Sequence, residues 1–274
     1  MDVIEKFGNR VSSQALKDPE KARRLLLAGY RLQEKKLQFL PDRELPSSGQ
    51  YVARVVMKNI ILFDVNQQHF DLLPLAFTRP VSDIRIGILT IREKWEHRLP
   101  GMYSYLTPEY MAAKYPAALS DDNIFIASHI LPDDSLVKQI SDLDPGEAIV
   151  CNQELLAFRG NEADFRNERY NRTIEYDHTL KCIRHLYDIF LMNGECLEAD
   201  FRLITNGRTS EKLSDSNRII GEPCFPDGTP KIFLEPGAHA ECAIFNVTNG
   251  PIYLGKDCEI MEGSCIRAPF AACE

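Results

Sequence analysis

The chain has 274 residues, 44% of them hydrophobic, and a formal net charge of −8. This length allows one large domain or two smaller ones, each with a full core. The negative charge argues against nucleic acid or an anionic membrane as the main partner. No apolar run approaches the length of a membrane span, and no apolar stretch at the amino terminus predicts a secretory signal. A cytoplasmic location is therefore expected.

The first 56 residues differ in composition from the rest. They contain eleven Lys and Arg residues against seven Asp and Glu residues. Pro19, with acidic neighbours, is a favourable first residue for a helix, which we expect to continue to about Phe39. Residues 41–50 have the composition of a linker. We therefore predict that residues 1–56 form a helical extension and a linker.

A strand, a long loop and a helix are predicted between residues 59 and 99. The apolar run Asn59–Phe63 predicts a buried strand, and Asp64 follows it directly. Ser82 is expected to cap a helix whose apolar residues share one stripe, namely Ile84, Ile88, Ile91, Trp95 and Leu99. A strand, a loop and a helix in this order are typical of the first half of an α/β nucleotide-binding unit.

The loop in this unit has no glycine between residues 64 and 83. This absence excludes a Gly-x-Gly-x-x-Gly or Walker loop, so side chains would have to bind a phosphate. The available cations are Arg79, Arg85, Arg92 and Lys94. Arg85 and Arg92 are predicted to share a helix face, and a solvated basic face is the alternative interpretation.

The middle of the chain continues the α/β pattern. The predicted elements are a short helix from Pro108 to about Lys114, a strand at Asn123–Ala127, a helix capped by Asp133 or Asp134 that ends at Ile140, a strand pair at Ala148–Cys151 and Leu155–Phe158, and a helix from Ile183 to about Leu197 with Asp200 capping the next element. Such alternation predicts a mostly parallel sheet, whose ligands bind beyond the carboxyl ends of the strands. Asp64 and the loop at 127–134 then lie on the ligand side.

The end of the chain carries a six-residue repeat. Aliphatic or small side chains recur at Leu254, Ile260, Ile266 and Ala272. This spacing favours a hexapeptide β-helix over an ordinary pair of edge strands. About one coil follows Leu254, whereas such helices need about three stacked repeats. We therefore predict an α/β domain at 57–228 and an incomplete β-helix at 229–274.

Three stretches of the sequence resemble a known family. They are LLPLAFTRPVSDIRIGILTIREKW at 72–95, YDIFLMNGECLEADF at 187–201 and GPIYLGKDCEIMEGSCIR at 250–267. These segments are similar in sequence to a divergent bacterial branch of the bifunctional UDP-N-acetylglucosamine diphosphorylase / glucosamine-1-phosphate N-acetyltransferase family. The resemblance covers residues 57–274. It implies an α/β domain of the nucleotide-diphospho-sugar transferase type (GT-A or Rossmann-like), followed by the start of a left-handed β-helix.

The resemblance also implies a reaction and its participants. A nucleoside triphosphate and a sugar 1-phosphate, expected to be UTP and N-acetylglucosamine 1-phosphate, would give UDP-N-acetylglucosamine. The later coils that carry the acetyltransferase site in the family are absent from this sequence. A complete chain would form a homotrimer. In the mainstream family a Thr-Arg pair followed by Lys-Pro holds the nucleotide, and Thr78-Arg79-Pro80 is similar to it.

The residue roles expected from this resemblance are specific. Arg79 and Lys94 are the predicted catalytic residues, with Arg79 on the triphosphate. Thr78, Asp83 and Arg85 complete the predicted substrate site, and Asp64 is the predicted ligand of Mg²⁺. Asp64 and Asp83 also fit the alternative of ordinary loop or cap acids. A degenerate nucleotide-sugar-binding or scaffold domain that supports a trimeric β-helix is the alternative function, and a fragment without activity is the third.

Overall fold

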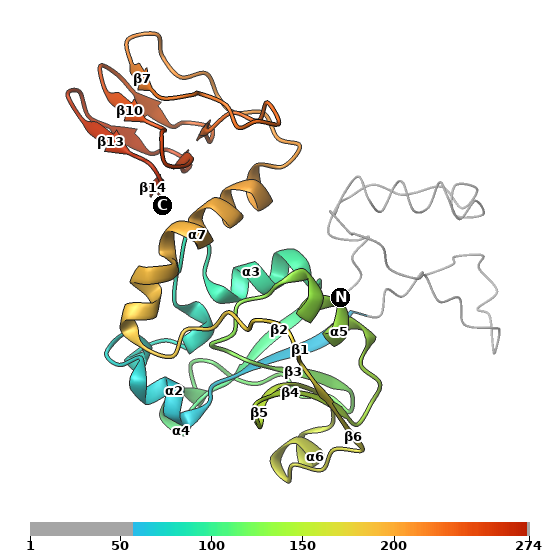
Figure 1. The fold of residues 1–274 in the computed structure, drawn as a ribbon. Coiled ribbons are helices and arrows are strands. Elements are labelled where there is room, and N and C mark those ends of the chain that lie inside the picture. The colour runs from blue at the N-terminus through green and yellow to red at the C-terminus, as the bar shows by residue number, and fades with distance from the viewer. Residues whose placement is uncertain (1–56, 273–274) are drawn as a thin grey trace, which may run out of the picture. The chain divides into compact units, whose positions relative to one another are not determined.

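The computed structural model describes residues 57–272 (Figure 1). The helix predicted from Pro19 to Phe39 and the linker predicted at 41–50 lie outside the described residues. The proposed division of the chain at residues 56 and 228 stays a prediction.

A six-stranded mixed sheet forms the centre of the α/β region. Its strands are, in spatial order, β2 (Gly101–Leu106), β1 (Lys58–Phe63), β3 (Asn123–Ala127), β5 (Glu154–Gly160), β4 (Glu147–Cys151) and β6 (Arg172–Glu175). β1 pairs in parallel with β2 and with β3, as the sequence predicts for the strands at 59–63 and 123–127. β4 and β5 form the predicted strand pair, which is antiparallel. The carboxyl ends of β1, β2, β3 and β4 therefore lie along one edge of the sheet.

Helices connect these strands and cover them. They are α2 (Asn66–Asp71), α3 (Ile91–Arg98), α4 (Glu109–Ala112), α5 (Asp134–Asp142), α6 (Glu162–Arg166) and α7 (Leu186–Thr205), with 3-10 turns η3 (Leu75–Phe77) and η4 (Val81–Asp83). Figure 1 shows α2 directly after the carboxyl end of β1, with α4 beside it. The predicted Asp133 cap of α5 is confirmed, because its side chain accepts a hydrogen bond from the backbone of Leu136.

The helix predicted to start at Ser82 was wrong, because α3 begins only at Ile91. Gly87 has a φ of +79°, which interrupts a right-handed helix. Thr90 then caps α3 in a capping box with Glu93, whose carboxylate accepts the Thr90 N–H at 2.7 Å. As a consequence Arg85 lies outside the helix and shares no helix face with Arg92.

The predicted apolar stripe is nevertheless buried. Ile84 and Ile88 pack from the loop, whereas Ile91 and Trp95 pack from α3. Trp95 is fully buried, as predicted, and its indole N–H donates to the carbonyl of Ile130 at 2.9 Å. The core therefore ties α3 to the segment that follows β3.

The long helix α7 also differs from the prediction. It extends to Thr205, and Asp200 lies inside it instead of capping the next element. Asp200 is buried. A buried carboxylate within a helix requires partners from other elements, and these are described below.

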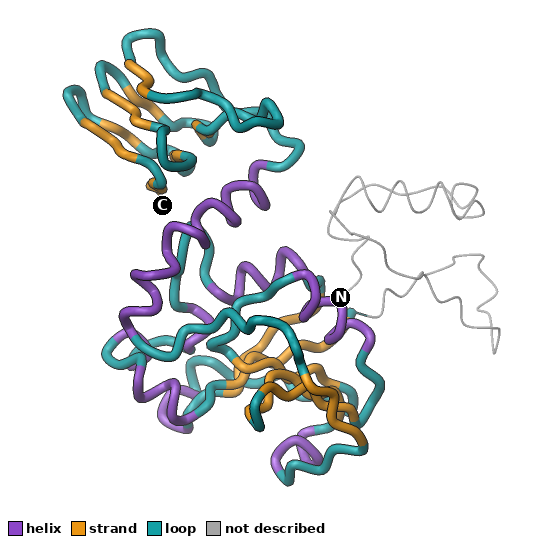
Figure 2. The backbone as a smooth tube through the Cα atoms, viewed as in Figure 1, coloured by secondary structure: helices purple, strands orange, loops and turns teal. Residues whose placement is uncertain are grey.

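The last part of the described chain consists of short stacked strands joined by longer loops (Figure 2). The strands are β7 (Arg218–Ile220), β8 (Ile232–Leu234), β9 (His239–Ala240), β10 (Ile244–Asn246), β11 (Ile252–Leu254), β12 (Glu259–Ile260), β13 (Cys265–Arg267) and β14 (Phe270–Ala272). They pair in parallel as β13-β10-β7, β14-β11-β8 and β12-β9. The repeat from Leu254 to Ala272 places one residue on each of β11, β12, β13 and β14. This arrangement is compatible with the start of a β-helix, and its stacking already includes β7.

Candidate functional site

Polar residues directly follow the three parallel strands at one end of the sheet. Asp64 follows β1, Thr107 follows β2 and Ser128 follows β3. Within residues 57–272, the buried hydroxyls of Thr107 and Ser128 have no hydrogen-bond partner. Ligands of open α/β sheets bind at this edge, so the candidate site is placed here.

The side chain of Asp64 is completely buried at this edge. Its carboxylate accepts a hydrogen bond from the backbone N–H of Val81 at 3.2 Å and lies 3.2 Å from Nδ1 of His69. In the part of the chain that the structure describes, no group of three or more His, Cys, Asp and Glu side chains could hold a metal ion. A carboxylate that is engaged on both oxygens and closed to solvent does not fit the open oxygen site that Mg²⁺ requires.

Thr78 and Arg79 lie in the loop between η3 and η4, and both are exposed. The carbonyl of Thr78 accepts a hydrogen bond from the hydroxyl of Tyr115 at 3.3 Å. Among the described residues, the guanidinium of Arg79 has no hydrogen bond or ion pair. Its five donors are therefore available to an anion.

Asp83 lies close to Arg79 in the sequence and anchors a half-buried network. The hydroxyl of Tyr105 donates to Asp83 at 2.9 Å, and the guanidinium of Arg92 donates to the same hydroxyl. Arg92 also lies over the Tyr105 ring, 5.6 Å from its centroid. We call Thr78, Arg79, Asp83, Arg92 and Tyr105 the edge cluster.

The electrostatics of the edge cluster follow from partial burial. Loss of water raises the pKa of Asp83, while the hydrogen bond from Tyr105 and the charge of Arg92 oppose the shift. Burial likewise raises the pKa of Tyr105 to about 12. The phenol is therefore neutral at physiological pH and can donate to the carboxylate of Asp83.

Lys94 and Arg85 lie in a different environment. Lys94 is buried on α3, and its ammonium pairs with Asp200 of α7. Asp200 also accepts the backbone N–H groups of Ile88 and Leu89, at 2.9 and 3.0 Å. The exposed Arg85 donates to the carbonyl of Ile88 within the same turn.

A further hydrogen bond connects this turn to α7. The side chain of Asn193 accepts the N–H of Gly87 at 2.8 Å. We call Gly87–Leu89, Lys94, Asn193 and Asp200 the joint. The structure thus places Thr78, Arg79 and Asp83 in one segment at the edge, where the charge of Arg79 acts on Asp83. It places Lys94 in the joint, with Arg85 in the adjoining turn.

Several residues of the site were not foreseen. The sequence pattern indicates no role for Tyr105 or His69, because it predicts no strand at 101–106 and predicts a loop where α2 lies. Tyr110 lies in a predicted short helix whose neighbours the sequence does not reveal. Arg92 was considered only as one cation of a helix face. The alternation of Tyr103 and Tyr105 in the run GMYSYL is the signal that could have revealed β2.

A second ionic cluster lies farther along the same edge. Nε2 of His129 is 2.8 Å from Oε1 of Glu154, and the guanidinium of Arg184 donates to the other oxygen at 2.8 Å. His129 is buried and Glu154 is partly exposed. The close approach of His129, together with the hydrogen bond from Arg184, lowers the pKa of Glu154 to about 2 despite burial.

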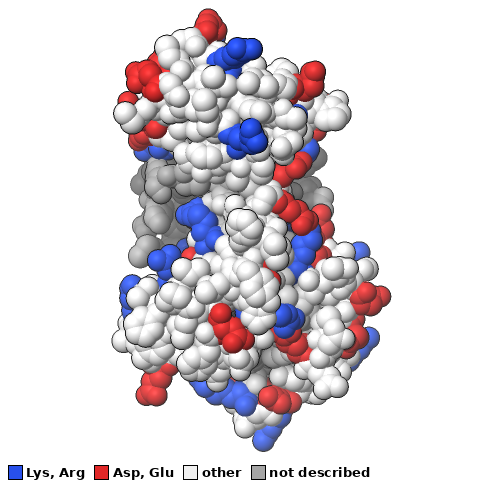
Figure 3. Space-filling model, turned by 60° about the vertical axis from the view of Figure 1, so that its left-hand side comes forward, with Lys and Arg blue, Asp and Glu red and all other residues white. Residues whose placement is uncertain are grey.

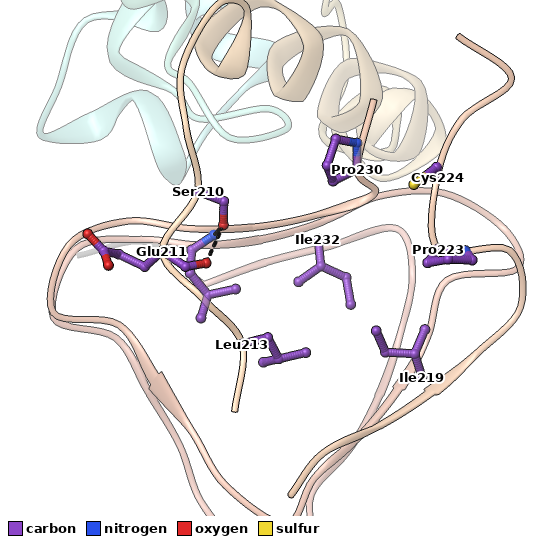
Figure 4. Close-up of a pocket in the computed structure, with 9 residues that line it drawn as sticks. Ser210, Glu211, Leu213, Ile219, Pro223, Cys224, Pro230 and Ile232 are labelled. Atoms are coloured by element: carbon purple, nitrogen blue, oxygen red, sulfur yellow. Dashed lines mark hydrogen bonds between the residues drawn. The ribbon is translucent and has the colours of Figure 1, made fainter. Parts of the chain in front are cut away.

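An apolar cavity of about 260 Å³ lies among the stacked strands. Leu213, Ile219 and Ile232 point toward one another inside it, and Pro223 and Pro230 close one side (Figure 4). None of the residues predicted for the substrate site lines this cavity. Its lining offers few polar groups for a phosphate.

A family model described as sugar nucleotidyl transferase matches residues 60–209. The chain belongs to this family. The match includes every residue predicted for the site and ends before β7, so it does not cover the stacked strands. Membership indicates a nucleotidyltransferase that uses a nucleoside triphosphate and a sugar phosphate. No curated protein matches the chain.

Basic and acidic side chains are interspersed over the face shown in Figure 3. Among residues 57–272, no helix is both long enough and apolar enough to cross a membrane.

Proposed function

We propose that this sugar nucleotidyltransferase forms UDP-N-acetylglucosamine from UTP and N-acetylglucosamine 1-phosphate. The family match supports the reaction class, and the resemblance of residues 72–95, 187–201 and 250–267 supports this pair of substrates. An oxygen of the sugar phosphate attacks the α-phosphorus of UTP and forms a new P–O bond. The bond from the α-phosphorus to the bridging oxygen breaks, and pyrophosphate leaves with the electron pair.

The observation that carries this proposal is the exposed Arg79 guanidinium at the ligand edge of the sheet. Protein groups in such a transfer act by positioning and by stabilising charge. Arg79 can bind two phosphate oxygens at once. Thr78 and Asp83 flank it, and Asp83 fixes Arg92 through Tyr105. Lys94 is paired within the joint, so we propose that it orders α3 without contacting substrate.

Magnesium enters the proposal only as an ion carried by the triphosphate. Mg²⁺ commonly keeps several waters and binds through one or two carboxylates and substrate phosphates. Because Asp64 is closed to solvent, we assign it to the structure of the loop and assign no step to the metal. We propose that the stacked strands form a left-handed β-helix. We also propose that a chain with a complete β-helix forms a homotrimer, and that the protein is cytoplasmic.

The experiment that tests the function uses the 274-residue chain. UDP-N-acetylglucosamine with Mg²⁺ is expected to raise the melting temperature, because it binds only the folded state. Calorimetric titration then compares the unaltered chain with Arg79→Lys, which keeps the charge and loses the forked donor geometry. We expect binding to weaken by about 1–3 kcal/mol, the scale of charged hydrogen bonds.

A matched control is Arg166→Lys, which alters an exposed arginine on α6 that pairs with Glu162. It is expected to leave the affinity unchanged. Equal affinities of the unaltered chain and Arg79→Lys would remove Arg79 from the site.

The alternative function is a nucleotide-sugar-binding or scaffold domain that supports the stacked strands. The closed environment of Asp64 favours it, because the loop after β1 offers no open carboxylate there. Failure of UDP-N-acetylglucosamine to bind either form would favour the scaffold. Binding without release of pyrophosphate from UTP would favour a binding domain.

A further inference from the structure

An exposed aromatic surface lies at the carboxyl ends of β1 and β2. Phe70 of α2, Phe77 of η3 and Tyr110 of α4 expose 66%, 62% and 59% of their surface. The rings of Phe77 and Tyr110 have centroids 6.0 Å apart and are tilted by 33°. We call Phe70, Phe77 and Tyr110 the aromatic platform. Three separate elements thus expose large rings after these strands, and ring contacts join Phe77 to Tyr110 and Phe70 to the neighbouring His69.

A buried polar chain runs from Asp64 to the platform. Nδ1 of His69 faces the Asp64 carboxylate, and Nε2 lies 2.9 Å from the hydroxyl of Tyr110. Because a carboxylate only accepts, Nδ1 must carry a proton. In the neutral imidazole, Nε2 then accepts the hydroxyl proton of Tyr110. The carbonyl of Phe77 lies 3.3 Å from the same hydroxyl.

This chain fixes the polar end of Tyr110 and leaves its ring exposed. Burying a carboxylate and an imidazole is costly unless both are hydrogen-bonded. Here each bond orients a neighbour, because Asp64 orients His69 and His69 orients Tyr110. A fixed aromatic ring loses little further conformational freedom when a flat ligand stacks on it. The contacts therefore hold the Tyr110 ring in place for a ligand. A tyrosine with only a structural role would not need to expose its ring.

We propose that the aromatic platform stacks the base of the nucleoside triphosphate whose phosphates Arg79 binds. Arg79 follows Phe77 by two positions in the sequence, and its guanidinium makes no ion pair within residues 57–272. An exposed aromatic surface near an exposed cation complements a nucleotide, which has an aromatic base at one end and phosphates at the other. Every base has a π-face, so stacking supplies affinity without selecting one base. This proposal rests on the proposed function.

The test separates the base from the phosphates. The full chain is titrated calorimetrically with UTP, ATP, CTP and GTP, and separately with inorganic tripolyphosphate. Tyr110→Ala is expected to weaken nucleoside triphosphate binding about 5- to 100-fold and to leave tripolyphosphate binding unchanged. Arg79→Lys is expected to weaken both. Phe190→Ala is the matched control, because it removes an aromatic ring that is 82% exposed on α7.

A second variant controls for loss of folding in the first. Tyr110→Ala leaves Nε2 of the buried His69 without its hydrogen-bond partner, which lowers stability. Phe77→Ala removes a platform ring whose side chain makes no hydrogen bond, and it is expected to show the same selective loss. Preserved nucleotide affinity in folded Phe77→Ala and Tyr110→Ala would overturn the stacking proposal alone. If none of the four triphosphates binds the unaltered chain, the proposed function fails as well.

Discussion

The joint and the edge cluster contain similar charged residues that have different roles. In the joint, Lys94 and Asp200 are 5% and 3% exposed, and they pair with each other. In the edge cluster, Arg79 is exposed and Asp83 is only half-buried. A fully desolvated and hydrogen-bonded pair stabilises an arrangement of helices, whereas an exposed cation remains available to a ligand. Residue type and proximity in the sequence do not separate these two cases, but burial does.

Breaking the joint should have the largest effect on stability. Asp200→Ala leaves the Lys94 ammonium buried without its partner and removes the acceptor of two backbone N–H groups. We expect the free energy of unfolding to fall by about 3–5 kcal/mol, the usual loss when one partner of a buried pair is removed. Urea denaturation followed by circular dichroism measures this loss.

The control for Asp200 is another acid on the same helix. Glu198 pairs with Arg202 at the surface, where both side chains are 45% exposed. Glu198→Ala should change the free energy of unfolding by less than about 1 kcal/mol. Losses of similar size in the two variants would show that the joint is not the stronger contact.

The His129–Glu154–Arg184 cluster should have an effect on stability of intermediate size. This effect is measured through the pH dependence of the free energy of unfolding. The pKa of Glu154 in the folded protein, about 2, lies below its ordinary value of 4.5. Its contribution to stability is therefore complete above about pH 4.5 and is lost as the pH falls toward 2. Between pH 6 and pH 3, the unaltered chain should lose about 1 kcal/mol more unfolding free energy than Glu154→Gln, after allowance for solvent screening.

Denaturation of both forms at pH 6 and pH 3 tests this expectation. Groups distant from Glu154 titrate alike in both forms, so the difference measures this carboxyl together with its contacts to His129 and Arg184. Identical pH dependence would mean that His129 and Arg184 do not stabilise ionised Glu154.

The smallest effect on stability is expected at Arg79. Its side chain is exposed and makes no ion pair among the residues that the structure describes, so Arg79→Ala should change the unfolding free energy by less than about 0.5 kcal/mol. Thermal denaturation without ligand measures this change. A loss of 2 kcal/mol or more would place Arg79 among the structural contacts, as Lys94 is.

The parts of the fold that were predicted depend on local sequence. The runs at 59–63 and 123–127 are apolar after the asparagine with which each begins, and Asp133 caps its own helix. Neither feature requires knowledge of distant residues. The helix expected from Ser82 failed although local signals were present. Gly87 marks a left-handed turn, and Thr90 with Glu93 forms a readable capping box. The prediction gave more weight to the apolar stripe at residues 84–99 than to these two signals.

The site was only partly foreseen because its contacts join distant parts of the chain. Asp200 is 106 positions from Lys94, and their pairing has no signature in either neighbourhood. The bond from His69 to Tyr110 likewise joins two segments that meet only because β1 and β2 are neighbours. Thr78, Arg79 and Asp83 could be predicted together because they lie within six consecutive residues.

Gly87 links the turn before α3 to the placement of a helix far along the chain. A Cβ at this position would lie 2.6 Å from the Asp200 carboxylate and 2.7 Å from the backbone carbonyl carbon of Cys196. Because backbone atoms lie at that distance, position 87 has no space for the Cβ of any residue other than glycine. Over evolution, residue 87 should therefore covary with residues 193 and 200. Sequences that replace this glycine should also lack the asparagine and the aspartate, because α7 would have moved away.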